Sequence, residues 1–103
     1  MTLDEYQSQA WITAIYPKEA SIIYPAMGLA NEAGEVLGKV KKKIRDGAFD
    51  REATINELGD VLWYVAVLAD DLGVSLSDVA KINLDKLNSR KERGTLQGSG
   101  DNR

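Results

Sequence analysis

The sequence predicts an all-α fold of four helices. Apolar residues recur at helical spacing along most of the chain, whereas no stretch alternates apolar and polar residues and no Asn-Gly or Asp-Gly turn joins two apolar runs. The length of 103 residues suits one domain, and we identify no internal repeat and no second domain.

The two prolines of the chain help to place the first two helices. The first helix is expected over residues 3–15, ending before Pro17. An irregular link follows, and Pro25 suits the first turn of the second helix, because the N–H that proline lacks has no helical partner there. This second helix is expected to run to about Ile44, with Asp46 and Gly47 as its end.

Capping residues place the other two helices. Asp50 is expected to cap the third helix, which ends near Leu72 and Gly73, and Ser75 is expected to cap the fourth. The fourth helix is expected to run from residue 76 to about residue 93, before Gly94. Residues 95–103 are rich in glycine and polar side chains, so we expect a tail that is mobile when nothing is bound.

The apolar pattern of the third helix predicts an oligomer. Residues 61–69 are apolar on every side, which indicates that the helix is covered all round. One stripe consists of Leu58, Leu62, Val65, Ala69 and Leu72, widened by Val61 and Leu68, and the opposite side carries Trp63, Ala66 and Val67. So short a chain does not easily cover one of its own helices, so a second subunit is the simpler explanation. The alternative is a helix covered within one chain.

The composition excludes several kinds of chemistry. Cysteine and histidine are absent, so disulfides, thiolate nucleophiles, zinc–sulfur sites, Ser-His-Asp triads and imidazole catalysis are impossible. Thirteen Lys and Arg against 16 Asp and Glu give a net charge of −3, which disfavours nucleic acid and anionic membranes as partners. No basic leader and no long apolar segment is present, so we expect a cytoplasmic protein.

Two pairs of carboxylates border apolar helix surface. Glu32 and Glu35 on the second helix, and Glu57 and Asp60 on the third, are each spaced i, i+3, so each pair emerges on one helix surface. If the two helices pack antiparallel, the four side chains converge, and carboxylates removed from water need a cation. Oxygen ligands alone favour Mg²⁺ or Mn²⁺. The alternative to a metal site is that both pairs of carboxylates lie on solvated helix faces.

The fourth helix carries a polar row of Asn83, Lys86 and Arg90, with Asn83 between core positions on the helical wheel. An amide, an ammonium and a guanidinium facing acidic helices would suit a metal-bound polyphosphate. The alternative, stronger for Arg90 than for Asn83, is a long side chain that covers the core and keeps its charge in water.

Other candidates for the site lie elsewhere in the chain. Of the basic residues that end the second helix, only Lys39, one turn after Glu35, is a candidate; the others suit a solvated face at the negative end of the helix dipole. A pocket for a base needs a flat ring. Trp11 and Tyr64 are candidates for this role, although Trp11, like Tyr6, Tyr16 and Tyr24, is first a candidate for the core or an interface.

These motifs resemble a known family. Glu32-Ala33-Gly34-Glu35, followed after 21 residues by Glu57-Leu58-Gly59-Asp60, is similar to the ExxE…ExxD signature of the all-α nucleotide pyrophosphohydrolases, and most similar to the MazG-like group. The stretch Asn83-Leu84-Asp85-Lys86-Leu87 and the ending Gly98-Ser99-Gly100-Asp101-Asn102-Arg103 agree with this group. Asn31 departs from it, because small residues often precede the first glutamate.

The resemblance implies a four-helix bundle-like protomer that assembles as a dimer or as a tetramer of two dimers. Residues 1–94 would form the catalytic domain and residues 95–103 a flexible tail. The implied reaction is Mg²⁺-dependent hydrolysis of a nucleoside triphosphate between the α- and β-phosphates, giving a monophosphate and pyrophosphate. The implied role is cleansing of the nucleotide pool.

The resemblance also implies roles for individual residues. Glu32, Glu35, Glu57 and Asp60 would hold the metal, and Asn83, Lys86 and Arg90 the substrate. Glu35, or otherwise Glu32, would take the proton from the attacking water, and Lys86 would offset charge on the leaving pyrophosphate. The tail would close over the nucleotide, a hypothesis that deletion of residues 95–103 tests.

Three alternatives to this reading remain. The first is a dUTP-type hydrolase, the second is a phosphoribosyl-ATP pyrophosphohydrolase, and the third is a non-catalytic helical interaction module that only binds a cation. A panel of substrates separates the first two from the proposed reaction, and the absence of pyrophosphate release from every nucleotide identifies the third.

Overall fold

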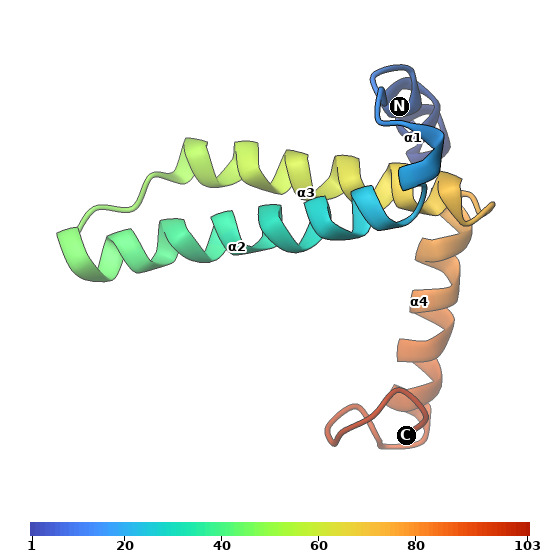
Figure 1. Cartoon of the computed structure of the whole chain (residues 1–103). Helices are drawn as coiled ribbons and strands as arrows, with labels where there is room; N and C mark the ends of the chain where they lie inside the picture. The colour runs from blue at the N-terminus through green and yellow to red at the C-terminus, as the bar shows by residue number, and fades with distance from the viewer.

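The computed structural model describes all residues, 1–103, and contains only helices and their connections. The elements are α1 (Leu3–Ile12), a short 3₁₀ helix η1 (Lys18–Ala20), α2 (Ile23–Asp46), α3 (Arg51–Asp71) and α4 (Leu76–Glu92). α2 and α3 form a long antiparallel hairpin, α1 lies across its open end, and α4 turns away from that end (Figure 1). The prediction of an all-α fold with four α-helices is confirmed.

The local signals for the helix ends are confirmed at most positions. The side chain of Asp50 accepts a hydrogen bond from the Ala53 amide at the start of α3, and Ser75 accepts one from the Asp78 amide at the start of α4. Gly47 ends α2 in a left-handed conformation with a φ of 79°, which glycine adopts without steric cost.

Two connections differ from the prediction. α1 ends at Ile12 instead of residue 15, because Thr13 leaves the helix to accept a hydrogen bond from Trp63 Nε1 at 2.7 Å and donates one to the Ala10 carbonyl. The link to α2 contains η1, which was not predicted. α2 begins at Ile23, so Pro25 is the third residue of the helix, which confirms its predicted place in the first turn, and it is fully buried.

The core is small and lies where α1, α3 and α4 meet. It consists of Ala10, Ala66, Val67 and Leu76, with partly buried aromatic rings packed around it. Gln7 joins the three helices through buried hydrogen bonds, because its Nε2 donates to the Ala66 and Val74 carbonyls and its Oε1 accepts from the Leu76 amide. A buried amide with every partner supplied fixes the angle between the helices more strictly than apolar contact does.

The hairpin leaves apolar side chains uncovered. On α3 Leu58 is 54% exposed and Leu62 is 39% exposed, although Ala66 and Val67 further along are completely buried. On α2 Leu37, Val40 and Ile44 are exposed as well. At helical spacing these five residues lie on the sides of the two helices that face away from Glu32 and Asp60. We call them the hairpin back face.

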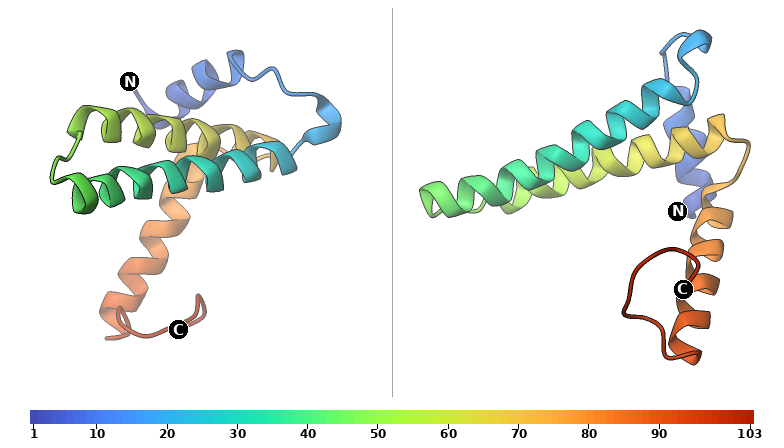
Figure 2. Two further views of the ribbon diagram at one scale, coloured as in Figure 1. Left: turned by 60° about the vertical axis from the view of Figure 1, so that its left-hand side comes forward. Right: turned by 60° about the horizontal axis from the view of Figure 1, so that its bottom comes forward.

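Over residues 61–69, a single chain buries or half-buries every side chain of α3 except Leu62, so the alternative of a helix covered within one chain holds for most of this segment. Leu58 and Leu62 stay uncovered, and their cover by a second subunit remains a prediction. The view in Figure 2 shows why: α1 and α4 both lie near one end of the hairpin and leave the rest of it bare. No helix of the chain combines the length and apolar character needed to cross a membrane.

Candidate functional site

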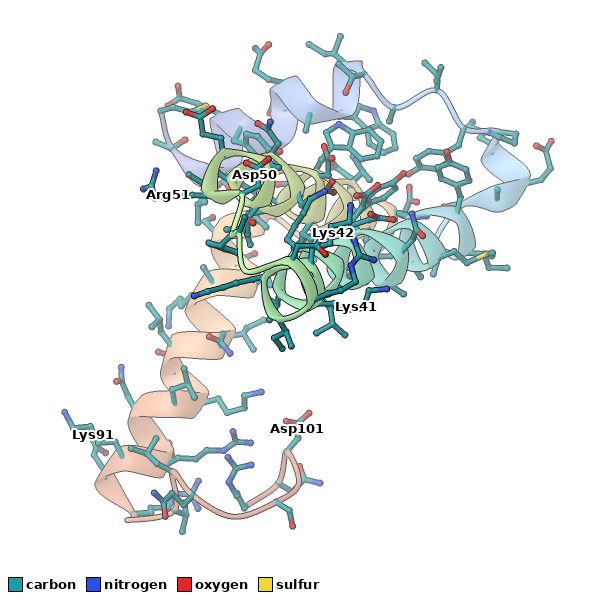
Figure 3. The ribbon with its side chains drawn as sticks, turned by 90° about the vertical axis from the view of Figure 1, so that its left-hand side faces the viewer. Lys41, Lys42, Asp50, Arg51, Lys91 and Asp101 are labelled. Carbon is teal, nitrogen blue, oxygen red and sulfur yellow. The ribbon has the colours of Figure 1, made fainter.

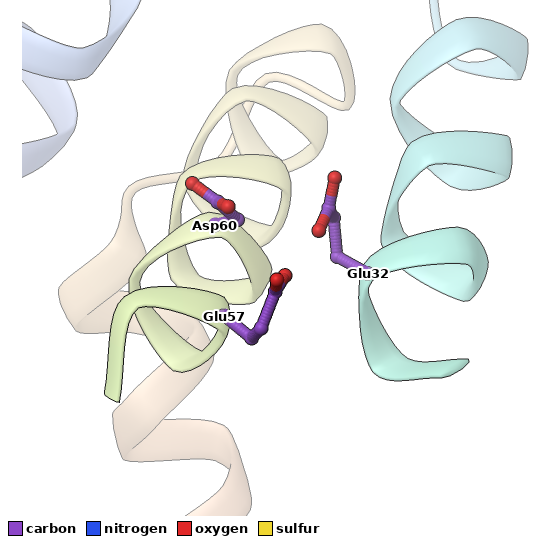
Figure 4. Close-up of side chains that lie close together, drawn as sticks. All are labelled: Glu32, Glu57 and Asp60. Carbon is purple, nitrogen blue, oxygen red and sulfur yellow. The ribbon is translucent and has the colours of Figure 1, made fainter. Parts of the chain in front are cut away.

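Three carboxylates converge between α2 and α3. Glu32 on α2 and Glu57 and Asp60 on α3 place one oxygen each within 4.8 Å of one another (Figure 4). Glu32 and Glu57 are half-buried, and Asp60 is exposed. The antiparallel packing of the hairpin brings them together, because it sets the side chain of one helix opposite the i, i+3 pair of the other.

Negative charge outweighs positive charge in this group of carboxylates. The pKa of Glu32 is raised above its ordinary value, first by a hydrogen bond with the Glu57 side chain, then by burial and by the negative charges of Asp60, Glu57 and Glu35. One cation is near, since Lys39 Nζ lies 4.0 Å from Glu57 Oε1. A divalent cation bound to three carboxylate oxygens would remove this repulsion, and the all-oxygen donor set suits Mg²⁺ or Mn²⁺.

A pH dependence of stability follows from the raised pKa. Between 4.5, the ordinary pKa of Glu32, and its raised value, the folded protein binds more protons than the unfolded chain, so stability falls as pH rises. In EDTA we therefore expect the Tm advantage of Glu32→Gln over the wild type to grow as pH rises through this window. Saturating Mg²⁺ should abolish this trend in the wild type. Thermal melts from pH 4 to 7 measure both, and a constant difference in Tm would contradict the prediction.

Glu35 lies outside the three-carboxylate group. It follows Glu32 by one turn of α2, is exposed, and comes close enough for its charge to contribute to the raised pKa of Glu32. The structure therefore brings together three of the four predicted metal ligands and places the fourth beside them. Lys39, the only site candidate among the basic residues that end α2, is next to the group, while Lys41 and Lys42 are exposed near the far end of α2 (Figure 3).

Tyr64 forms a wall of the site. Its ring packs directly over Gly28 of α2, where a methyl group would overlap the ring atoms. The pKa of Tyr64 is raised, mainly by burial and by Tyr24, and to a smaller extent by the charges of Glu32 and Asp60. No role was predicted for Gly28 from the sequence. A glycine inside a helix, where it costs about 1 kcal/mol relative to alanine, was the signal that could have identified it.

Trp11 lies away from the carboxylates, at the open end of the hairpin. It is 45% exposed and lines a cavity of about 190 Å³. The other residues of this cavity are Ala14, Tyr16, Lys18, Ser21 and Asp71. The structure thus does not place Trp11 beside the predicted metal ligands, but it does place it in a pocket.

The polar row of α4 is not part of the carboxylate group within one chain. α4 packs against α1 and α3 and then runs away from the hairpin, as Figures 1 and 2 show. Asn83 is exposed, so the expectation that its amide faces the core is wrong. Arg90 is only 4% exposed, so the alternative of a side chain with its charge in water is wrong for this residue. Lys86 is partly exposed.

The tail contacts Lys86 and Arg90 of this row. Arg90 Nη2 donates to the Asp101 carbonyl at 2.7 Å, and Asp101 Oδ1 lies 3.4 Å from Lys86 Nζ and 3.5 Å from Arg90 Nη2. Arg103 closes the tail into a loop by donating to the carbonyls of Thr95, Leu96 and Gly100. Figure 3 shows Asp101 beside α4 at the turn of this loop. Sequence reasoning gave no sign of this closed shape, and mobility of the tail stays a prediction.

Comparison with known proteins finds one matching family model and two similar proteins. The family model of the MazG nucleotide pyrophosphohydrolase domain matches residues 25–95, which include α2, α3 and α4. Gene 37 protein of Mycobacterium phage L5 is 51% identical, over the full length of both chains. Uncharacterized protein YvdC of Bacillus subtilis (strain 168) is 32% identical, over 82% of this chain and 93% of that protein. No solved structure matches the chain.

Proposed function

The chain belongs to the MazG nucleotide pyrophosphohydrolase family, and we propose that it hydrolyses nucleoside triphosphates between the α- and β-phosphates with the help of Mg²⁺. The observation that carries the proposal is the group of Glu32, Glu57 and Asp60, whose oxygens lie within 4.8 Å of one another. Mn²⁺ is the expected substitute, since it accepts the same ligands.

We assign each of the four carboxylates a role in this reaction. Glu32, Glu57 and Asp60, with Glu35 beside them, would hold the divalent cation, and such a cation would supply neutralisation of phosphate charge and a lowered pKa of a water molecule. Glu35 is the proposed general base, because it is the carboxylate outside the converging group and stays free to accept a proton from the attacking water. Glu32 is the second candidate for this role.

We propose a homodimer, or a tetramer of two dimers, as the active form. Asn83, Lys86 and Arg90 would bind the triphosphate, and Lys86 would offset charge on the leaving pyrophosphate. Because α4 leaves the hairpin that carries the carboxylates, this row meets a carboxylate group most readily in another subunit. The uncovered hairpin back face supports the same assembly, since exposed apolar surface of this extent marks an interaction site.

The proposed biological role is the removal of unwanted nucleotides from the cytoplasmic nucleotide pool. A dUTP-type or phosphoribosyl-ATP pyrophosphohydrolase is the second candidate, and a non-catalytic cation-binding interaction module is the third. In the closed tail loop Asp101 pairs with Lys86 and Arg90, so a triphosphate that binds these two cations would have to displace it.

Pyrophosphate release from a panel of canonical and modified ribo- and deoxyribonucleoside triphosphates tests the proposal. The panel is run with Mg²⁺ and with EDTA, and it includes phosphoribosyl-ATP. Release that needs Mg²⁺ and is lost in Glu35→Gln is the expected result. No release from any nucleotide by folded, oligomeric protein would overturn the proposal and favour the interaction module.

A further inference from the structure

The cavity that contains Trp11 lies in line with the carboxylates. On α3, Glu57, Asp60, Tyr64 and Asp71 follow at i, i+3, i+7 and i+14, so their side chains share one face of the helix. Asp71, which lines the cavity, is about 16 Å beyond Asp60 at 1.5 Å per residue. The cavity and the carboxylates therefore lie on the same side of α3.

Tyrosine rings connect the two ends of the face. Tyr64, beside the carboxylates, lies with its ring centroid 6.4 Å from that of Tyr24. Tyr24 is stacked on Tyr16, with centroids 4.9 Å apart, and Tyr16 lines the cavity. With Trp11 on another side, the cavity has two aromatic walls and a volume of about 190 Å³. This is smaller than a typical ligand pocket of about 300–1,000 Å³, and it suits one part of a ligand, such as a flat ring.

Asp71 is held rigidly at the cavity. Its Oδ2 accepts hydrogen bonds from the Tyr16 hydroxyl at 2.7 Å and from the Ile22 amide at 2.9 Å. Ile22 adopts a φ of 70°, a strained conformation for a β-branched residue, so the surrounding structure fixes this link strongly. The other oxygen, Oδ1, accepts no hydrogen bond from the protein. A fixed carboxylate with one free oxygen recognises a hydrogen-bond donor.

We propose that this cavity binds the nucleobase of the substrate and that Asp71 Oδ1 accepts a hydrogen bond from the exocyclic amino group of the base. The inference rests on the proposed function and adds a substrate class: nucleotides whose base presents an amino group, such as cytosine or adenine, are preferred over those with uracil or thymine. The 4-oxo group of uracil and thymine places an acceptor opposite the carboxylate oxygen.

The experiment compares CTP with UTP, which differ at position 4 of the same ring. The wild type is expected to show a kcat/KM for CTP about tenfold or more above that for UTP, which is the usual effect of one hydrogen bond to a charged group. Asp71→Asn should remove or reverse this preference, because its oxygen can still accept from Tyr16 and Ile22 while its NH₂ group donates to the uracil oxygen. Asp70→Asn, one residue earlier and on another helix face, is the control and should keep the preference.

Binding of the product monophosphate separates this inference from the proposed function. Quenching of tryptophan fluorescence by CMP and UMP in EDTA needs neither metal nor turnover, and CMP should bind the wild type more tightly. Hydrolysis of triphosphates with equal preference in the wild type and in Asp71→Asn would overturn the inference and leave the proposed function intact. Should Asp71→Asn not fold, Ala14→Phe fills the cavity instead; an unchanged KM for CTP would equally contradict the inference.

Discussion

Glu32→Gln is expected to lower kcat for Mg²⁺-dependent pyrophosphate release by about a thousandfold or more, and at the same time to raise the Tm of the metal-free protein. The loss of activity follows because the variant removes a charged ligand from a site where the cation supplies several kcal/mol of charge stabilisation. The gain in stability follows because Glu32 is half-buried and repelled by three neighbouring carboxylates, which is why its pKa is raised.

The two effects together separate a metal site from an ordinary structural cluster. Relief of like-charge repulsion between surface carboxylates is worth a few tenths of a kcal/mol, or about 1–3 °C in Tm for a domain of this size. Added Mg²⁺ should raise the Tm of the wild type and leave that of Glu32→Gln nearly unchanged. Glu52→Gln, which removes an exposed carboxylate in the first turn of α3, is the control and should retain activity. A variant that loses activity and also melts much lower than the wild type would contradict this account.

Local chemistry explains which parts of the fold could be predicted. Asp50, Ser75 and Gly47 act within a few residues of their own positions, so the ends of three helices follow from the sequence. The end of α1 does not, because Thr13 is drawn out of the helix by Trp63, fifty residues away along the chain. Gln7 is similar: nothing in its neighbourhood indicates that its amide joins α3 and α4.

The candidate site divides in the same way. Spacing on one helix predicts that Glu57 and Asp60 emerge together, and antiparallel packing of a hairpin is enough to bring Glu32 to them. The cavity at Asp71 depends on contacts between distant segments, since Tyr16 reaches α3 from the irregular link after α1. An aspartate at the end of a helix gives no sign of such a partner, so sequence reasoning identified Trp11 as a ring and missed the carboxylate beside it.

Leu58→Glu is expected to convert the protein into a monomer without activity. Leu58 is 54% exposed in the single chain and lies on the hairpin back face with Leu62, Leu37, Val40 and Ile44. In a symmetric dimer formed through this face, each substitution places a charge twice in an apolar interface, which costs several kcal/mol and raises the dissociation constant at least about a hundredfold. Light scattering after size exclusion should then give the monomer mass of 11.3 kDa.

Asn88→Glu is the matched control, because it adds the same charge at an exposed position of α4, outside the hairpin and on the side of α4 opposite Lys86 and Arg90. This variant should keep both the mass of the oligomer and the activity. The core of one chain consists of only a few small residues. The monomeric Leu58→Glu protein should therefore have a Tm well below that of the wild type, and this Tm should depend less on protein concentration. Leu58→Glu that remains an active oligomer would exclude the hairpin back face as the interface. A wild type that is monomeric and active at micromolar concentration would show that activity needs no second subunit. In that case α4 would have to move so that its polar row reaches the carboxylates of its own chain.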